Sequence, residues 1–334
     1  MDREILKREQ AITLIKDTFS TELIKELNLV KVSSPLIVLD GTGINDDLNG
    51  VERPVKFPIK CLDEQPGVVV HSLAKWKRMR LKELDVEVGR GIITDMRALR
   101  PDEDYSPLHS IYVDQWDWEK HIEPEQRTLD FLKRTVNKIY NAIKHTEQIV
   151  HDHYKRIMTS LPEKITFIHA EELLQKYPDK TAKQRENAAA KEFGAIFVIG
   201  IGGSLSDGKA HDGRAADYDD WSTPNDDGYN GLNGDIIVWN PILECAFELS
   251  SMGIRVDKNA MQVQLKEKNC EHRKSLLFHK QLLHNELPES IGGGIGQSRL
   301  CMFMLKGRHI GEVQVSIWPE KEKKKAEKEG IHML

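Results

Sequence analysis

The sequence predicts an α+β fold, a single domain in which helices flank a mostly antiparallel β-sheet. Apolar strands that follow one another in the chain are joined by short polar loops rather than helical crossovers, which is typical of antiparallel pairing. Other segments repeat apolar residues at intervals of three and four, which indicates helices packed on the sheet. Because no linker interrupts the 334 residues, we expect one domain over 1–334.

The first half of the chain is expected to contain two long helices and several strands. Residues 4–28 place Ile12, Ile15 and Phe19 on one face of an amphipathic helix. The second helix covers 125–158. Strands are expected at 35–39, 55–61, 67–71, 92–99 and 110–118, with 55–61 and 67–71 as the arms of a hairpin.

The second half alternates helices, strands and one long polar stretch. Helices are expected at 181–192, 259–285 and 298–306, and strands at 195–200, 235–239, 245–250 and 313–318. The Gly- and Asp-rich region 202–234 looks too polar for the core. Gly200, Gly202 and Gly203 follow a strand, but Leu205 breaks the GxGxxG spacing, so a turn is the better interpretation than a dinucleotide site.

The amino-acid composition argues against several classes of protein. The chain has 48 Lys plus Arg and 53 Asp plus Glu, a net charge of −5, which argues against a nonspecific nucleic-acid binder. No apolar run approaches the roughly 20 residues of a membrane span, and the N-terminus lacks a signal peptide. Four scattered cysteines (Cys61, Cys245, Cys270, Cys301) indicate neither a disulfide framework nor a zinc site. We expect a cytoplasmic protein without nucleic-acid or membrane partners.

An arginine-containing loop between two predicted strands is the first candidate site. Arg100 stands at a strand end, where a guanidinium can clamp a phosphate, and Glu103 and His109 follow it. In the returning strand Gln115, Asp117 and Glu119 alternate, so they share one face. That face is either solvated or the floor of a site, and the pattern leaves both open.

A glycine-rich segment and an acidic pair complete the candidates. GGGIG at 292–296 is expected to open the helix that carries Arg299, and a helix N-terminus favours anions. A cation there indicates either an anionic ligand or a surface carboxylate partner. Asp235 and Glu248 lie on neighbouring predicted strands and could face each other as Mg²⁺ ligands. His211 is more typical of a surface histidine than of a metal ligand.

The order of these motifs resembles the three signatures of class II aminoacyl-tRNA synthetases, most closely the aspartyl and asparaginyl enzymes, without their anticodon-binding barrel. Over its length the chain is similar to the asparagine synthetase A family, the ammonia-dependent aspartate–ammonia ligases. Seven stretches carry this resemblance: VVHSLAKWKR (69–78), ALRPDED (98–104), SPLHSIYVDQWDWE (106–119), DYDDWSTP (217–224), GLNGDI (231–236), FELSSMGIRVD (247–257) and IGGGIGQSRL (291–300). The loop at 41–50 and Val51 depart from the family pattern.

The resemblance implies an AMP-forming ligase that makes L-asparagine from L-aspartate, ATP and ammonia through β-aspartyl-AMP, with Mg²⁺. It implies catalytic roles for Asp46, Arg100 and Gln115, with Asp46 taking ammonia's proton. Aspartate would be held by Ser72, Lys77, Asp117, Asp219, Ser251 and Arg255. ATP would contact Arg100, Glu103, His109, Asp235, Glu248, Gly294 and Arg299, with Asp235 and Glu248 on the metal. The first signature, residues 4–39, implies a homodimer, and the apolar Ile12, Ile15 and Phe19 fit such an interface.

Two other functions remain open. A tRNA-charging enzyme would need a basic RNA-contact surface and an anticodon module, and neither is visible in the sequence. A noncatalytic amino-acid sensor would tolerate loss of Arg100, Arg299 and the acidic pair, and all of these are present.

Overall fold

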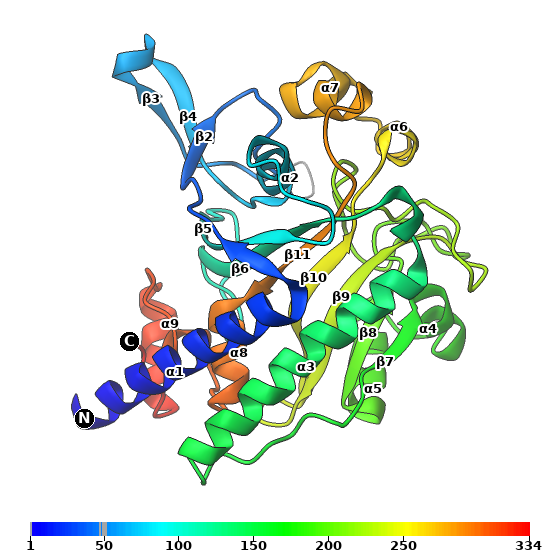
Figure 1. Ribbon diagram of the computed structural model, residues 1–334. Coiled ribbons are helices and arrows are strands. Elements are labelled where there is room, and N and C mark those ends of the chain that lie inside the picture. The colour runs from blue at the N-terminus through cyan, green and yellow to red at the C-terminus, as the bar shows by residue number, and fades with distance from the viewer. Residues whose placement is uncertain (1, 47, 49–51) are drawn as a thin grey trace.

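The computed structural model describes residues 2–46, 48 and 52–334. Val51 and part of the loop at 41–50 therefore lie outside the described residues. The centre is an eight-stranded sheet, beside which stands a three-stranded one (Figure 1). The large sheet has the order β1 (Leu29–Lys31), β5 (Gly91–Leu99), β6 (Tyr112–His121), β11 (Ser290–Gly296), β10 (Cys245–Ile254), β9 (Asn233–Asn240), β8 (Ala195–Ile199), β7 (Thr166–His169).

Antiparallel pairing dominates this sheet, as predicted. The five pairs from β5 to β8 are antiparallel, and only the outermost pairs, β1 with β5 and β7 with β8, are parallel. The α+β prediction is confirmed. β1, β7 and the short helix α4 (Ala170–Lys176) were not predicted, because none is long enough to show a clear period.

One face of the sheet is covered by two helices that lie side by side, α1 (Asp2–Leu27) and α3 (Leu129–His153) (Figure 1). Ile12, Ile15 and Phe19 of α1 are buried in this layer, and the Phe19 ring lies 4.7 Å from that of Trp116 on β6. These side chains therefore cover the chain's own sheet. The idea that their apolar character marks a dimer interface is wrong, although the homodimer itself stays a prediction.

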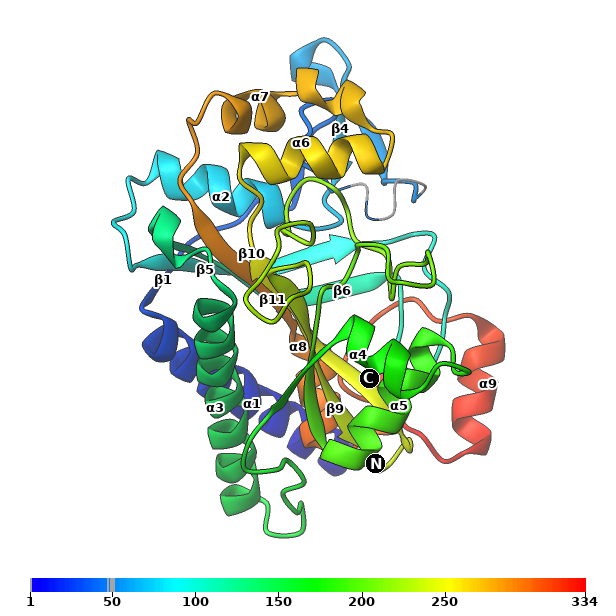
Figure 2. The ribbon, with the colours of Figure 1, turned by 90° about the vertical axis from the view of Figure 1, so that its right-hand side faces the viewer.

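The opposite face is only partly covered by helices. Ile196 and Val198 of β8 pack against α4 and α5 (Ala182–Phe193), whereas Phe197 between them points to the first face. In Figure 2 these two helices lie on the side turned toward the viewer, below the loops that cross the sheet. On this face α5 also contacts β10, and the helix α2 (Ala74–Glu83) contacts β6 and β11; the candidate site lies on these strands between the helices.

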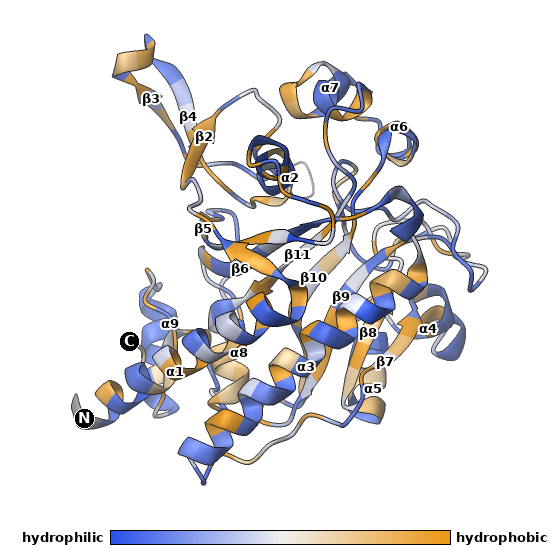
Figure 3. Cartoon of the chain, in the orientation of Figure 1, coloured by the Kyte–Doolittle hydropathy of each residue, from blue (hydrophilic) through white to orange (hydrophobic). Residues whose placement is uncertain are grey.

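A small sheet and a polar helix stand over the same area. The predicted hairpin is confirmed as β3 (Lys56–Ile59) and β4 (Gln65–Val69), with β2 (Ile37–Leu39) paired on β4. The helix α2 (Ala74–Glu83) was not predicted, because most of its residues are charged (Figure 3). It nevertheless buries Lys75, Lys77 and Arg78.

The 202–234 region corrects the sequence interpretation. It is not excluded from the core: Asp217, Asp219 and Trp221 are each at most 2% exposed, and His211, expected at the surface, is 4% exposed against Glu186. The positive φ angles of Gly200 and Gly202 confirm a turn after β8. The loop is polar because it buries charges in pairs.

Three further boundaries differ from prediction. The helix expected at 259–285 is divided into α6 (Lys258–Glu267), a 3₁₀ turn (Glu271–Ser275) and α7 (Leu277–Leu283), after a break at Asn269, whose φ is 55°. GGGIG lies in β11, and α8 (Gln297–Met304) follows it directly. No strand forms at 313–318, and the charged tail is the helix α9 (Glu320–Lys328).

Two sequence expectations about composition can be compared with the structure. The four cysteines are free, and burial raises the pKa of Cys301 to about 12, which suits an inert thiol. Among the described helices, none combines the length and the apolar character that crossing a bilayer requires.

The layer between α1 and the sheet generates a stability prediction. Replacing the fully buried Phe19 by Ala removes the ring that packs on Trp116, so the free energy of unfolding should fall by about 3–5 kcal/mol. Denaturant unfolding at fixed protein concentration measures the change. Leu6→Ala, at a position 59% exposed on the same helix, should change it by less than about 0.5 kcal/mol. Similar effects of both changes would contradict the packing described.

Candidate active site

Two adjoining pockets form one cleft on the open face of the sheet. Their volumes are about 230 and 300 Å³. They share six lining residues, Arg100, Glu103, Gln115, Glu248, Ser251 and Gly294, so they are two halves of one site. The smaller half extends toward α8, and the larger half extends toward α2 and the 211–220 loop.

The larger half has a floor of buried charges from β6. Asp117 accepts a hydrogen bond from Lys77 Nζ on α2 at 2.9 Å, and the same ammonium donates to the carbonyl of Gly293 at 2.9 Å. Burial lowers the pKa of Lys77, and the neighbouring Asp117 opposes that shift. Gln115 and Asp117 therefore line the floor of the site, and Glu119 is fully buried beneath it, so the solvated-face alternative is wrong.

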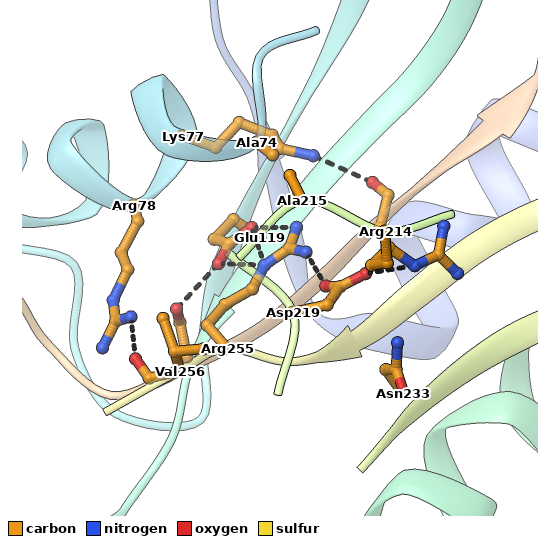
Figure 4. Close-up of polar contacts among 12 residues, drawn as sticks. Ala74, Lys77, Arg78, Glu119, Arg214, Ala215, Asp219, Asn233, Arg255 and Val256 are labelled. Carbon is orange, nitrogen blue, oxygen red and sulfur yellow. Dashed lines mark hydrogen bonds and ion pairs between the residues drawn. The ribbon is translucent and has the colours of Figure 1, made fainter. Parts of the chain in front are cut away.

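Arg255 connects this floor to the 211–220 loop (Figure 4). Its guanidinium donates to both oxygens of Glu119, at 2.8–3.1 Å, and also binds Asp219. Burial alone would lower the pKa of Arg255, but the two carboxylates raise it above its usual value. Burial opposes ionisation of Glu119 as well, yet Arg255 holds its pKa below the ordinary range. Arg255 and Glu119 are therefore both charged.

Arg214 continues the series to β9. It lies 3.5 Å from Asp219 and donates to Asp235 Oδ1 at 2.6 Å. Burial raises the pKa of Asp235 to about 7 despite Arg214, and the nearby charge of Glu248 adds to the shift. We call this set of paired side chains the charge ladder; its members are Lys77, Asp117, Glu119, Arg255, Asp219, Arg214 and Asp235.

The smaller half contains the phosphate-binding candidates. Arg299, in the first turn of α8, donates to the carbonyl of Glu248 at 3.1 Å and to His109 Nε2 at 2.7 Å. Burial lowers the pKa of His109 to about 4, and Arg299 adds to the effect, so the imidazole is neutral and can accept this bond. The carboxylate of Glu248 is 3.7 Å away, so Arg299 has a surface carboxylate as well as an open pocket.

Asp46 faces the larger half from the loop after β2. It is 1% exposed; its Oδ1 accepts the backbone N–H of Leu48 at 3.1 Å, and its Oδ2 has no partner among the described residues. Burial raises the pKa of Asp46, and Lys75 is the strongest opposing charge. A buried carboxylate oxygen without a partner is unusual and indicates a place for a ligand or a transferred proton.

The cleft brings together almost all of the residues selected from the sequence. Two of the selected carboxylates do not line it: Asp235 lies behind Arg214, and Glu119 lies behind Arg255. The residues that do line it are Asp46, Ser72, Lys77, Arg100, Glu103, His109, Gln115, Asp117, Asp219, Glu248, Ser251, Arg255, Gly294 and Arg299.

Sequence reasoning missed Arg214 and the cations behind Asp46. Arg214 lies in the stretch HDGRAADYDD, whose mixed charges looked like a solvated loop. The available signal in this stretch was the mixture of basic and acidic residues next to an aromatic one, which could have indicated buried ion pairs. Among the described residues no three His, Cys, Asp or Glu side chains gather as a metal site. Asp235 and Glu248 therefore have no third His, Cys, Asp or Glu beside them, among the described residues, that would complete a metal site.

Comparisons with known proteins all relate this chain to the same family. A family model described as aspartate–ammonia ligase matches residues 6–330. The chain is 55% identical over 326 residues to an aspartate–ammonia ligase of Parabacteroides distasonis, covering 98% of this chain and 94% of that protein. It is 54% identical over 331 residues to the one of Bacteroides thetaiotaomicron, covering 99% and 96%.

Solved structures with the same fold are class II synthetases. The asparaginyl-tRNA synthetase of Pyrococcus horikoshii, complexed with asparaginyl-adenylate, matches with a TM-score of 0.68 at 15% identity, over 94% of this chain and 70% of that one. The enzyme of Entamoeba histolytica gives 0.66 at 14% identity, over 93% and 67%. At this identity the likeness concerns the fold.

The packing of β11 against the charge ladder generates a prediction. A Cβ at Gly292 would lie 1.9 Å from Glu119 Oε2 and 2.6 Å from Arg255 Nη2, so Gly292→Ala forces this pair apart. Glu119 cannot retreat cheaply, because Arg255 and Ser290 fix it. We expect the free energy of unfolding to fall by about 2–5 kcal/mol.

Gly203→Ala is the matched control, since its nearest contact is 3.3 Å away. Denaturant unfolding of both variants measures the difference. An unchanged Gly292→Ala protein would show that the Glu119–Arg255 pair is not fixed as described.

Proposed function

Because the chain belongs to the aspartate–ammonia ligase family, we propose that it makes L-asparagine in two steps at this cleft. In the first, the β-carboxylate of L-aspartate attacks the α-phosphate of ATP, giving β-aspartyl-AMP and diphosphate. In the second, ammonia attacks the β-carbonyl and AMP leaves. The observation that carries the proposal is a continuous cleft with two buried carboxylate oxygens, on Asp46 and Asp117, that have no partner in the described part of the chain.

The larger half is proposed to hold aspartate. This substrate has two carboxylates and one ammonium, so its pocket needs fixed charges of both signs. Lys77 and Arg255 supply the cations, and Asp117 Oδ2 and Asp219 supply anions for the ammonium. Ser72 and Ser251 line the same space and can hydrogen-bond to the substrate.

The smaller half is proposed to hold ATP. Arg100 and Arg299 face the space from two elements, where preset cations stabilise the charge that develops on the α-phosphate and the leaving diphosphate. Gln115 lines both halves and can hold the reacting phosphate by hydrogen bonds. Glu103 and His109 complete the wall, and at Gly294 a Cβ would lie 2.2 Å from Gln115, so only glycine leaves this contact open.

Mg²⁺ is proposed to bind with ATP. Asp235 and Glu248 offer the oxygen ligands that it prefers. Burial raises the pKa of Asp235 and the charge of Glu248 adds to the rise, and a cation bound there would oppose both effects. Two carboxylates suffice when phosphate oxygens and water complete the coordination. The ion would neutralise phosphate charge during adenylation.

Asp46 is proposed to act in the second step. Ammonia is mostly ammonium at neutral pH, as free amines are, and must lose a proton before it attacks. A buried carboxylate with an open oxygen can bind ammonium and accept that proton. A homodimer, a single catalytic unit over 1–334 and a cytoplasmic location remain predictions.

The decisive experiment measures AMP and asparagine formation by the purified protein. Both should require L-aspartate, ATP, Mg²⁺ and an ammonium salt together, and EDTA should abolish them. Glutamine freed of ammonia should not replace ammonium, because no cysteine is found among the described residues that line the cleft. Aspartylation of tRNA without asparagine formation would support the synthetase alternative, and ligand binding without AMP would support a sensor.

A substitution separates the two steps. Asp46→Asn should keep aspartate-dependent exchange of diphosphate into ATP but lower asparagine formation by about 100-fold or more, because the amide cannot accept a proton. Asp40→Asn, at an exposed position on the same loop, serves as the control and should keep both activities. Equal loss of both activities in Asp46→Asn would remove Asp46 from this role.

A further inference from the structure

A serine hydroxyl stands behind the histidine that contacts Arg299. Ser106 Oγ lies 2.7 Å from His109 Nδ1, and it accepts the backbone N–H of Leu108 at 3.1 Å. The other ring nitrogen of His109, Nε2, lies 2.7 Å from Arg299 Nη2. Ser106 is not among the described residues that line the cleft, so it can act on a ligand there only through a neighbour.

These two contacts decide which ring nitrogen of His109 carries the proton. A guanidinium has N–H donors and no acceptor, so Nε2 must accept the hydrogen bond from Arg299. Burial and the neighbouring Arg299 lower the pKa of His109 to about 4, so the ring is neutral and its single proton lies on Nδ1. Ser106 Oγ therefore accepts this N–H. The opposite tautomer would set two donors against each other at 2.7 Å.

The turn that contains Ser106 holds its hydroxyl in place. Ser106 and His109 exchange two backbone hydrogen bonds of 3.3 Å each across the turn Ser-Pro-Leu-His. The carbonyl of Pro107 accepts the N–H of Ile310 at 2.7 Å, which fixes the turn to the segment that follows α8. Because a hydroxyl oxygen has two lone pairs, it can accept from Leu108 and His109 together. Backbone contacts therefore set the position of the acceptor before any ligand binds.

The His109 ring is one of three contacts that orient Arg299. The carbon stem of Arg299 passes close to Gly296, where a Cβ would lie 3.1 Å from Arg299 Cβ. Nη1 donates to the carbonyl of Glu248 at 3.1 Å, and Nη2 donates to His109. These bonds leave further N–H donors of the guanidinium for an anionic ligand in the pocket that Arg299 lines.

We propose that Ser106 is a positioning residue: by accepting the Nδ1–H of His109, it makes Nε2 the acceptor that orients Arg299 toward the phosphates of ATP. The inference rests on the ATP-binding role proposed above for the smaller half of the cleft. Without the hydroxyl, Nδ1–H loses its acceptor and the ring can carry its proton on Nε2 instead. An Nε2–H group cannot accept from Arg299, so the guanidinium would lose one of the contacts that orient it.

The first test needs no substrate. NMR spectra of protein made with isotope-labelled histidine report which ring nitrogen is protonated, and the His109 signals are those that disappear in His109→Gln. In the unchanged protein His109 should carry its proton on Nδ1. The Nε2–H form should appear in Ser106→Ala, whereas Ser106→Thr, which keeps a hydroxyl, should retain the Nδ1–H form. A serine with a merely structural role in the loop would leave the tautomer unmoved.

The second test compares the two substrates in asparagine formation. Ser106→Ala should lower kcat/KM for ATP by about tenfold, as expected for the loss of one hydrogen bond to a charged group, and should change the KM for aspartate by less than about threefold. Ser106→Thr should restore the value for ATP. Ser34→Ala is the control, because Ser34 is half-buried outside the cleft and its hydroxyl donates to the carbonyl of Asp95 at 3.3 Å. It should match the unchanged protein.

A double-mutant cycle tests whether Ser106 acts through Arg299. In an Arg299→Ala protein the guanidinium that His109 meets is already gone, so adding Ser106→Ala should lower kcat/KM for ATP by less than about twofold. If Ser106→Ala cost the same tenfold with and without Arg299, Ser106 would act by another route and the inference would be overturned.

An Nε2–H tautomer of His109 in the unchanged protein also overturns the inference, as does an unmoved tautomer in folded Ser106→Ala. If the unchanged protein formed no AMP from aspartate and ATP, the proposed function would fail. Calorimetric titration with ATP would then decide this inference, with the same loss of about tenfold expected in affinity. If Ser106→Ala does not fold, Ser106→Cys takes its place, since a thiol is only a weak acceptor.

Discussion

Charged side chains that are buried away from water must be paired with opposite charges. In the charge ladder this requirement connects a helix, three strands and a loop. Lys77 comes from α2, Asp117 and Glu119 from β6, Arg255 from the end of β10, Arg214 and Asp219 from the loop and Asp235 from β9. Because breaking a buried pair leaves an uncompensated charge that costs about 3–5 kcal/mol, each element is needed for the others. A loop and a helix that look like surface segments are thereby fixed on the sheet.

The same constraint prepares the site for its chemistry. The ladder's side chains are held by protein partners, so they need little rearrangement when substrate charge appears beside them. Space for this arrangement comes from β11, where Gly292 and Gly294 leave room for Glu119 and Gln115. The glycines that looked like a helix opening are thus needed within the strand, between two rows of polar side chains.

The spacing of apolar residues in the sequence predicted most of the helices and strands. It failed for segments whose buried residues are charged and paired with one another. The strands β5, β6, β8, β9 and β10 and the helices α1, α3 and α5 follow their apolar pattern. In contrast, α2 and the 211–220 loop have the composition of a surface, and only the structure shows which carboxylate each cation meets. For Ile12 and Phe19 the pattern identified a buried face correctly, but it cannot tell a partner's surface from the chain's own sheet.

For the site, motif resemblance located the residues that line the cleft but not the ones behind them. A residue facing the cleft is recognisable because its chemistry suits a substrate, as with Arg100 or Asp46. Lys75 and Asp217 face only other protein groups, and their separation of 142 positions gives no local signal. What connects them is the cost of burying either charge alone, so the environment of Asp46 follows from tertiary packing.

The two halves of the cleft also differ in how their charged side chains are buried and paired. The larger half is built on a floor of buried ion pairs, whereas Arg299 in the smaller half stays 23% exposed and makes its contacts with a neutral histidine, a backbone carbonyl and a partly exposed carboxylate. The protein therefore fixes the charges of the larger half in buried pairs and leaves the cation of the smaller half accessible.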